Sequence, residues 1–158
     1  EPVDLRNCLS SALSMMEPQL KLRVVKITRT LPRQPVMVMA DRIRLEQVII
    51  NLLRNALDAT RDSADPQIEL LLSSGEVAML TVRDNGHGID AEARKHLFEP
   101  FFTTKPGEHG LGLGLTLSAS LAAAAKGSLN VEHPVSGGTA FVLVLPLVSP
   151  PSESAEHP

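Results

Sequence analysis

Residues 41–61 read DRIRLEQVIINLLRNALDATR, and this stretch decides the fold. Apolar side chains recur through it at helical spacing, which predicts one long amphipathic helix with its apolar face toward a core. Asp41 is the expected N-cap, because its carboxylate can accept a backbone N–H of the first turn. The apolar positions are Leu45, Val48, Ile49, Leu52 and Ala56.

The opposite face of this helix carries polar side chains: Gln47, Asn51, Arg54, Asn55 and Asp58. Asparagine is a weak helix former, so two asparagines four residues apart are a poor choice for solubility alone. An amide oxygen can coordinate a hard cation without adding negative charge beside phosphates. The stripe therefore fits either an ordinary solvated face or a site for a metal and phosphates.

The segments around this helix alternate between helical and strand patterns. The other expected helices span residues 4–18, 91–97 and 112–125, and Pro18 and Gly127 are the expected ends of the first and the last. The expected strands span residues 22–30, 36–39, 67–73, 77–84, 128–133 and 139–147. Helices interleaved with hairpin-connected strands predict an α+β fold, with helices covering one face of a mixed, mostly antiparallel sheet.

Composition limits the possible functions. The net charge of −3 gives no basic surface, so nucleic acid is not an expected partner. No apolar run approaches the roughly 20 residues of a membrane span. Cys8 is the only cysteine, which excludes an internal disulfide and a zinc site built from cysteines.

The ends of the chain suggest how the domain is delimited. The first residue is Glu1 rather than Met, and a helical pattern follows at once, as expected for a piece of a longer protein. Residues 149–158 are rich in Pro, Ser and Glu, and they offer little apolar surface to bury. We therefore expect one domain over residues 1–148 and a disordered tail or linker over residues 149–158.

A carboxylate closes the strand at residues 77–84, directly before the turn DNGHG. Alternation puts Asp84 on the same side as the apolar Ala78, Leu80 and Val82, so a core-facing row would bury it. A buried carboxylate needs donors, and the exocyclic amine of adenine is one, whereas guanine presents a carbonyl oxygen there. The alternative is an ordinary Asp-Asn-Gly turn, with His87 pointing to solvent.

A glycine-rich segment, GLGLGL at residues 110–115, opens the helix of small residues. Backbone N–H groups at such a helix start can bind phosphate oxygens, and Lys105 just upstream could pair with a phosphate. A flexible loop before a packed helix is the plain alternative. A dinucleotide-binding turn needs GxGxxG directly after a strand, and a P-loop needs GxxxxGK followed by Ser or Thr; neither pattern is present.

Five motifs together resemble the ATP-binding catalytic domain of sensor histidine kinases, within the superfamily shared with gyrase and mismatch-repair ATPases. They occur in the family's order as an N box (51–59), a first glycine box (84–89), an F box (97–105), a second glycine box (110–115) and a last glycine box (137–141). The resemblance covers about residues 1–148 and implies a two-layer, Bergerat-type α/β sandwich. EPFFTTK and NALDA also resemble the branch that contains nitrogen-regulation and dicarboxylate-transport sensors.

The resemblance implies ATP and Mg²⁺ as cofactors, with Asn55 as the metal ligand, Asp84 on the adenine amine, and residues 100–110 as a mobile lid anchored by phenylalanines, Phe101 among them. The implied catalytic residues are Asn51, Asn55 and Lys105. The implied nucleotide-binding residues are Asn51, Asn55, Asp58, Asp84, Gly86, Gly88, Ile89, Phe98, Phe102, Thr103, Thr104, Lys105, Gly110, Leu111, Gly112, Leu113, Gly114 and Thr139.

This chain departs from the family pattern at two informative places. Many members resemble it except for a Lys and an aromatic residue where Asp58 and Ala59 stand, so Arg54 or Lys105 would have to contact phosphate instead. The superfamily's hydrolases have Glu where Asn51 stands, and an amide cannot activate water as a base. The resemblance therefore implies phosphoryl transfer to a protein nucleophile rather than hydrolysis.

The implied acceptor is a histidine on a separate dimerisation domain, because none of the five histidines of this chain lies in the family's acceptor context. The other implied partner is a response regulator, which would receive the phosphoryl group on an aspartate. The full-length protein is then expected to be a membrane-bound homodimer of the inner membrane, with this domain in the cytoplasm. The remaining alternatives are an ATP-hydrolysing or serine-kinase member of the superfamily, and a nucleotide sensor without enzyme activity.

Overall fold

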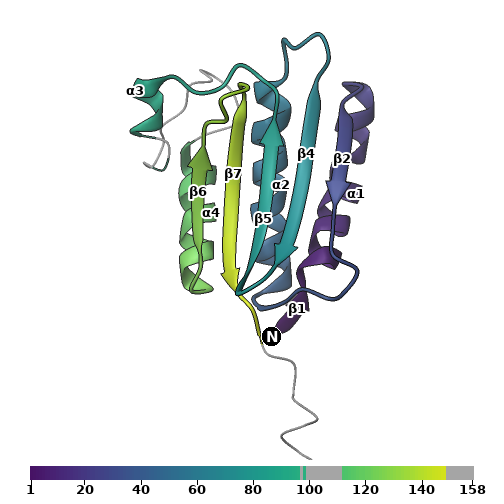
Figure 1. Ribbon diagram of the computed structural model, residues 1–158, viewed down its shortest axis with the longest axis vertical. Coiled ribbons are helices and arrows are strands. Elements are labelled where there is room, and N and C mark those ends of the chain that lie inside the picture. The colour runs from purple at the N-terminus through teal and green to yellow at the C-terminus, as the bar shows by residue number, and fades with distance from the viewer. Residues whose placement is uncertain (97, 99–111, 149–158) are drawn as a thin grey trace, which may run out of the picture.

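A five-stranded mixed sheet is the central element of the computed structural model, which describes residues 1–96, 98 and 112–148 (Figure 1). Its strands are β2 (Lys26–Thr30), β4 (Gln67–Ser74), β5 (Val77–Asp84), β6 (Ser128–Glu132) and β7 (Thr139–Pro146). Their order is β2-β4-β5-β7-β6; β2 runs parallel to β4, and the other pairs are antiparallel. The predicted mixed, mostly antiparallel sheet is confirmed.

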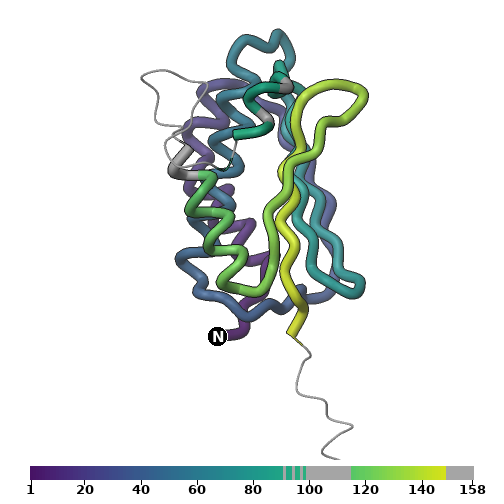
Figure 2. The backbone as a smooth tube through the Cα atoms, turned by 90° about the vertical axis from the view of Figure 1, so that its left-hand side faces the viewer, coloured from purple at the N-terminus to yellow at the C-terminus, as the bar shows by residue number. Residues whose placement is uncertain are grey.

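Three long helices lie side by side on one face of this sheet (Figures 1 and 2). They are α1 (Leu5–Leu22), α2 (Arg42–Ala59) and α4 (Gly112–Ala124), and the short α3 (Ala91–Arg94) lies beyond one end of the sheet. The core fills the space between the two layers. Its largest fully buried side chains are Leu5, Leu9, Met16, Ile49, Leu52, Leu53, Ile68, Leu70, Leu80, Leu143 and Leu145. The two-layer α+β prediction is therefore confirmed.

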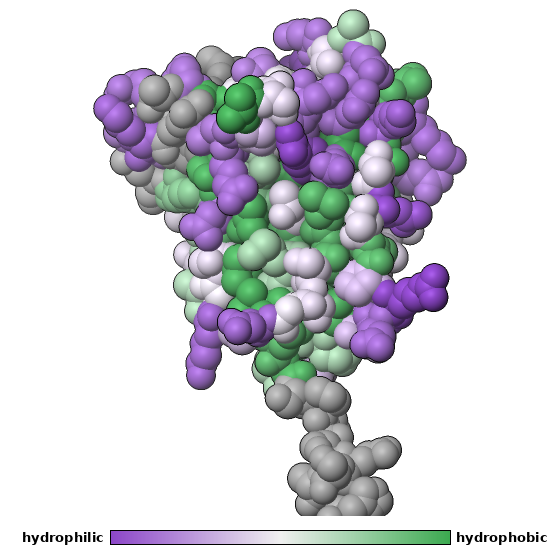
Figure 3. Space-filling view, viewed as in Figure 1, coloured by the Kyte–Doolittle hydropathy of each residue, from purple (hydrophilic) through white to green (hydrophobic). Residues whose placement is uncertain are grey.

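Among the residues that the structure describes, no helix covers the other face of the sheet, and Figure 3 views the molecule from that side. Apolar side chains run along the strands there, and polar side chains gather at the end near α3. Met79 on β5 is 38% exposed, whereas its neighbours Ala78 and Leu80 are fully buried. Alternate positions of β5 thus separate a core row from an exposed row, as the sequence pattern predicts.

The long amphipathic helix α2 begins where the sequence predicts. The backbone N–H of Arg44 donates to Asp41 Oδ1 at 3.2 Å, so Asp41 is the N-cap of α2. Side chains of the predicted apolar stripe are buried, with Ile49 and Leu52 fully so. This packing fixes which face of α2 turns away from the sheet and leaves its polar residues toward α4 and solvent.

A second, two-stranded sheet joins β1 (Pro2–Asp4) to β3 (Met37–Met39). Asp4 holds it in place, because its Oδ1 accepts the backbone N–H groups of Arg6 and Val36, each at 3.1 Å. The sequence pattern predicts the β3 strand but not β1. Three residues are too few for alternation to show a strand, and the partner is distant in sequence.

Two boundaries near the N-terminus differ from the prediction. α1 continues through Pro18 to Leu22, so the expectation that it ends near Pro18 is wrong. Leu20 is only 7% exposed, and its burial holds the last turn against the core. The first strand begins at Lys26 rather than residue 22, because Val24 takes a left-handed conformation (φ 52°) in the turn before it.

α4 ends near the predicted position, but the residue expected to end it, Gly127, is not the one in the left-handed conformation. Lys126, not Gly127, is the left-handed residue (φ 63°), and Gly127 N donates to Ala122 O at 2.8 Å. A Cβ on Gly127 would lie 2.0 Å from Val144 O, so glycine is required by the close approach of β7. α3 ends at Arg94, earlier than the predicted residue 97, which is outside the described residues.

Within residues 1–96, 98 and 112–148, no helix combines the length and apolar character needed to cross a bilayer. The predicted tail over residues 149–158 lies outside the described residues.

Candidate functional site

The last turn of α2, the end of β5 and the start of β7 meet at one end of the domain, uppermost in Figure 1. The backbone N–H of His87 donates to Ala59 O at 3.3 Å, which ties the turn after β5 to the end of α2. Thr139, the first residue of β7, is the register partner of Asp84. The N box and the first and last glycine boxes therefore come together at a single site.

Asp84 is buried at the centre of this site, with 3% of its surface exposed. Its Oδ1 accepts the backbone N–H of Gly86 at 2.8 Å. Burial raises the pKa of Asp84, against the opposing effects of the N–H groups of Gly86 and Thr139 and of His87. A further hydrogen-bond donor would stabilise the charged form of this buried carboxylate, and the exocyclic amine of adenine is such a donor.

The hydroxyl of Thr139 lies in the same buried region. Thr139 is 2% exposed, and in the part of the chain that the structure describes its Oγ1 has no hydrogen-bond partner. An unpaired buried hydroxyl is costly, of the order of 1–3 kcal/mol. A ligand or bound water that reaches Asp84 would remove this cost, so the two side chains together fit a polar ligand edge.

Glycines make the close backbone contacts of the site possible. A Cβ on Gly86 would lie 2.1 Å from Ala59 O, and one on Gly138 would lie 1.9 Å from Asp84 O. Gly88 takes a left-handed conformation (φ 76°), which glycine adopts without strain. Ile89 follows and is half-buried against the core. The turn is therefore compressed between α2 and β7 and can present its backbone to a flat ligand.

Asn85 has a role in the site that its sequence context does not reveal. Its Oδ1 accepts Gln67 N and its Nδ2 donates to Asp65 O, both at 2.8 Å. These bonds join the turn after β5 to the loop that follows α2. A turn residue in DNG gives no signal of such distant partners. His87 is exposed, as predicted.

The polar row of α2 runs toward this end of the domain. Asn51, Asn55 and Asp58 are half-buried, whereas Gln47 and Arg54 are exposed. Asn51 Nδ2 donates to Ser118 Oγ on α4 at 3.3 Å, and Asp58 pairs with Arg61 at 3.3 Å. The half-buried members are at i, i+4 and i+7, so they share one helical face. The amide oxygens of Asn51 and Asn55 are the kind of ligand that Mg²⁺ accepts beside phosphates.

The remaining predicted residues belong to the segment before α4 and to the first turn of α4. Phe98 is half-buried against the core, and Thr116 Oγ1 donates to its carbonyl at 2.7 Å. Gly112, Leu113 and Gly114 form the first turn of α4. The predicted residues outside the described ones are Phe102, Thr103, Thr104, Lys105, Gly110 and Leu111, together with Phe101 of the expected lid.

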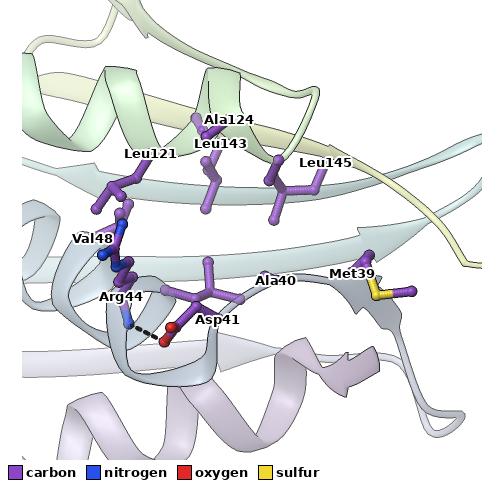
Figure 4. Close-up of a pocket in the computed structure, with 12 residues that line it drawn as sticks. Met39, Ala40, Asp41, Arg44, Val48, Leu121, Ala124, Leu143 and Leu145 are labelled. Atoms are coloured by element: carbon purple, nitrogen blue, oxygen red, sulfur yellow. Dashed lines mark hydrogen bonds between the residues drawn. The ribbon is translucent and has the colours of Figure 1, made fainter. Parts of the chain in front are cut away.

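A separate small groove lies between the start of α2 and the last turns of α4, over β7 (Figure 4). Its volume is about 170 Å³, and apolar side chains such as Val48, Leu121 and Leu145 line it, with Arg44 and Asp41 beside them. None of the predicted site residues that the structure describes lines this groove, so it is distinct from the region around Asp84.

Comparison with known proteins identifies the family. The family model described as "Histidine kinase-, DNA gyrase B-, and HSP90-like ATPase" matches residues 40–149, and the chain belongs to this family, for which ATP is the nucleotide. Among curated relatives, the C4-dicarboxylate transport sensor protein DctB of Pseudomonas aeruginosa is 39% identical over 147 residues, covering 92% of this chain and 24% of that protein. The chain thus spans about a quarter of the length of this relative.

Solved structures agree on the fold. The catalytic domain of histidine kinase ThkA superposes with a TM-score of 0.81 at 26% identity, covering 92% of this chain and 94% of that one. Full-length ShkA in complex with AMPPNP superposes with a TM-score of 0.79 at 27% identity, covering 96% of this chain and 32% of that one. The domain therefore has the fold of a histidine kinase catalytic domain, which confirms the implied Bergerat-type sandwich.

Proposed function

We propose that this chain binds ATP with Mg²⁺ and transfers the γ-phosphoryl group to a histidine on a separate dimerisation domain of a two-component sensor kinase. The observation that carries the proposal is the buried Asp84 carboxylate at the end of the polar row of α2. It lies beside the buried Thr139 hydroxyl, which has no hydrogen-bond partner among the described residues. One end of the site thus suits a purine edge, and the other suits a metal with phosphates.

In this proposal Asp84 accepts a hydrogen bond from the adenine amine, and Thr139 bonds to the same edge of the base, directly or through water. Gly88 and Ile89 line the base pocket, and the close packing of Gly86 on Ala59 keeps Asp84 in register with α2. Guanine would bring a carbonyl oxygen toward the carboxylate, so the site should prefer ATP to GTP.

The amide row would hold the other end of the nucleotide. Asn55 is the assigned metal ligand and Asn51 its neighbour at the phosphates, with Asp58 one turn further on. Mg²⁺ bound there would neutralise charge on the phosphates. The N–H groups at the start of α4 would bind phosphate oxygens. Lys105, Thr103 and Thr104 are assigned to the lid side of the nucleotide from the motif alone.

Transfer to protein rather than hydrolysis follows from Asn51. In the transfer step, the bond from the γ-phosphorus to the bridging oxygen breaks as a bond to an imidazole nitrogen forms, and ADP leaves. An amide cannot take the proton of an attacking water. The similarity to a C4-dicarboxylate transport sensor and to the histidine kinase ThkA, which has also been solved in complex with a response regulator, supports a sensor kinase that relays the phosphoryl group to such a regulator. We propose in addition that the full-length protein is a membrane-bound homodimer.

Calorimetric titration with ATP and GTP, with and without Mg²⁺, tests the binding half of the proposal. Wild-type chain should bind ATP in preference to GTP. Asp84→Asn should weaken ATP binding by about tenfold or more, because a hydrogen bond to a charged group is worth about 1.5–3 kcal/mol. Asp62→Asn, the same change at an exposed carboxylate, is the control and should bind normally. No heat of ATP binding to folded chain would refute the proposal.

Labelling with γ-³²P-ATP tests the transfer half. The chain alone should remain unlabelled, and adding a phosphoacceptor domain of a dicarboxylate-sensor relative should give acid-labile label on that domain. Asn55→Asp should reduce transfer more than it reduces ATP binding. Gln47→Glu makes the same amide-to-acid change on an exposed turn of α2 and should leave transfer unchanged. Steady phosphate release without acceptor would favour a hydrolase instead.

A further inference from the structure

α4 is built almost wholly of small and apolar residues, GLGLTLSASLAAA, yet it buries a hydroxyl against α2. Ser118 is fully buried, and its Oγ accepts Asn51 Nδ2 at 3.3 Å. Alanine at this position would fill almost the same space and suits a helix better than serine. The buried hydroxyl therefore calls for an explanation in terms of Asn51.

The bond gives the Asn51 side chain a definite orientation. A helical serine can donate its own hydroxyl proton to a carbonyl of the preceding turn, which leaves its oxygen as an acceptor. The carboxamide of Asn51 is planar, so a nitrogen turned toward Ser118 places Oδ1 on the opposite branch, away from α4. Asn51 then turns its oxygen acceptor toward the rest of the site, while Ser118 takes one of the two N–H groups of Nδ2.

We propose that Ser118 is a positioning residue for the Mg²⁺–ATP site: it fixes the Asn51 amide so that Oδ1 serves the metal or a water bound to it. The inference rests on the proposed function. A rotated amide would present N–H groups to the cation, which repel it. Losing Ser118 should therefore raise the Mg²⁺ concentration that is needed to enhance nucleotide binding, and should change little else.

Three variants separate this role from a merely structural one. Ser118→Ala removes the hydroxyl with almost no change of volume, and alanine suits a helix better than serine. Ser120→Ala makes the same change at an exposed position of α4 and serves as the control. Asn51→Ala removes the side chain through which Ser118 would act.

The measurements are ATP affinity without metal and the Mg²⁺ concentration that gives half-maximal enhancement of ATP binding, together with the melting temperature. In Ser118→Ala the Mg²⁺ requirement should rise about two- to tenfold, the range for loss of one neutral hydrogen bond, while metal-free affinity stays within error of wild type. Ser120→Ala should match wild type in both. Adding Ser118→Ala to Asn51→Ala should change nothing further.

The outcomes are distinct. A Ser118→Ala variant that equals Ser120→Ala in Mg²⁺ requirement overturns the inference, as does one that loses metal-free affinity in the same proportion, since that would show general loosening of α4. An additional effect of Ser118→Ala in the Asn51→Ala background also overturns it. A wild-type chain that binds no ATP at all removes the proposed function, and this inference with it.

Discussion

Replacing Gly86 by alanine tests whether the end of α2 and the Asp84 turn form one rigid unit. The added Cβ would lie 2.1 Å from Ala59 O and 2.5 Å from Ala59 C, and contacts below 3.0 Å essentially never occur. The turn must therefore move away from α2 by about 1 Å. That shift also lengthens the bond from His87 N to Ala59 O, which is already 3.3 Å.

The cost follows from these two effects. Forcing an extra carbon into a packed contact costs about 1–3 kcal/mol, and losing one hydrogen bond adds about 0.5–1.5 kcal/mol. At about 2–4 °C per kcal/mol for a domain of this size, Gly86→Ala should melt about 5–15 °C below wild type. Asp84 moves with the turn, so ATP affinity should fall by about tenfold or more, the value of a charged hydrogen bond.

Differential scanning calorimetry and ATP titration measure both quantities. Gly75→Ala is the matched control, because a Cβ at Gly75, in the turn between β4 and β5, meets nothing within 4 Å. It should change the free energy of unfolding by no more than about 0.5 kcal/mol. If Gly86→Ala melts like Gly75→Ala and binds ATP like wild type, the contact with Ala59 does not set the position of Asp84.

Three further predictions concern buried or bridging groups. Because burial raises the pKa of Asp84 in the folded state, protonation of Asp84 stabilises the fold below its unfolded value of 3.8, and this contribution is lost as the pH rises through the folded pKa. Asp84→Asn should therefore have a higher melting temperature than wild type at neutral pH, and this difference in melting temperature should shrink toward about pH 4. A difference that does not change with pH would contradict this prediction. Asn85→Ala should lower the free energy of unfolding, measured by denaturant titration, by about 1–2 kcal/mol, because it removes two bridging bonds. Asn130→Ala removes one local bond and should lower it by less; equal losses would count against the bridge. Burial raises the pKa of the Cys8 thiol to about 11, and the charge of Glu46 adds to the effect. Iodoacetamide at about pH 8 should therefore label unfolded chain but not folded chain. Rapid labelling of the folded chain would show that Cys8 is accessible.

The sequence predicts those parts of the fold whose pattern is local. Helical spacing and the Asp41 cap give α2 with its correct start, and alternation gives β4 and β5 as a hairpin. The same alternation places Asp84 on the core side, where it is 3% exposed. The chemistry expected of that position depends on its burial, so the pattern of residues 77–88 is sufficient to locate the candidate site.

Features that depend on distant partners could not be predicted in this way. β1 is stabilised by pairing with β3 and by the Asp4 side chain, and three residues carry no readable alternation. Pro18 ends many helices, but the burial of Leu20 keeps α1 going past it. Asn85 reads as a turn residue because turn propensity says nothing of which distant backbone groups its side chain will bond.

The rotation of α4 about its axis is the clearest case of information that hydropathy cannot supply. Its sequence is apolar nearly all round, so no face is marked for the core. Thr116 and Ser118 are two residues apart and so lie about 200° apart around the helix. Thr116 Oγ1 donates to Phe98 O at 2.7 Å, and Ser118 accepts from Asn51 at 3.3 Å.

These two bonds, on opposite sides, fix the rotation that hydropathy leaves open. Turning α4 by a quarter turn would break both bonds, at a cost of about 0.5–1.5 kcal/mol each. The same rotation sets the direction of the N–H groups in the first turn, at Gly112 and Gly114. The hydroxyls of Thr116 and Ser118 therefore connect the packing of an otherwise featureless helix to the phosphate end of the proposed site.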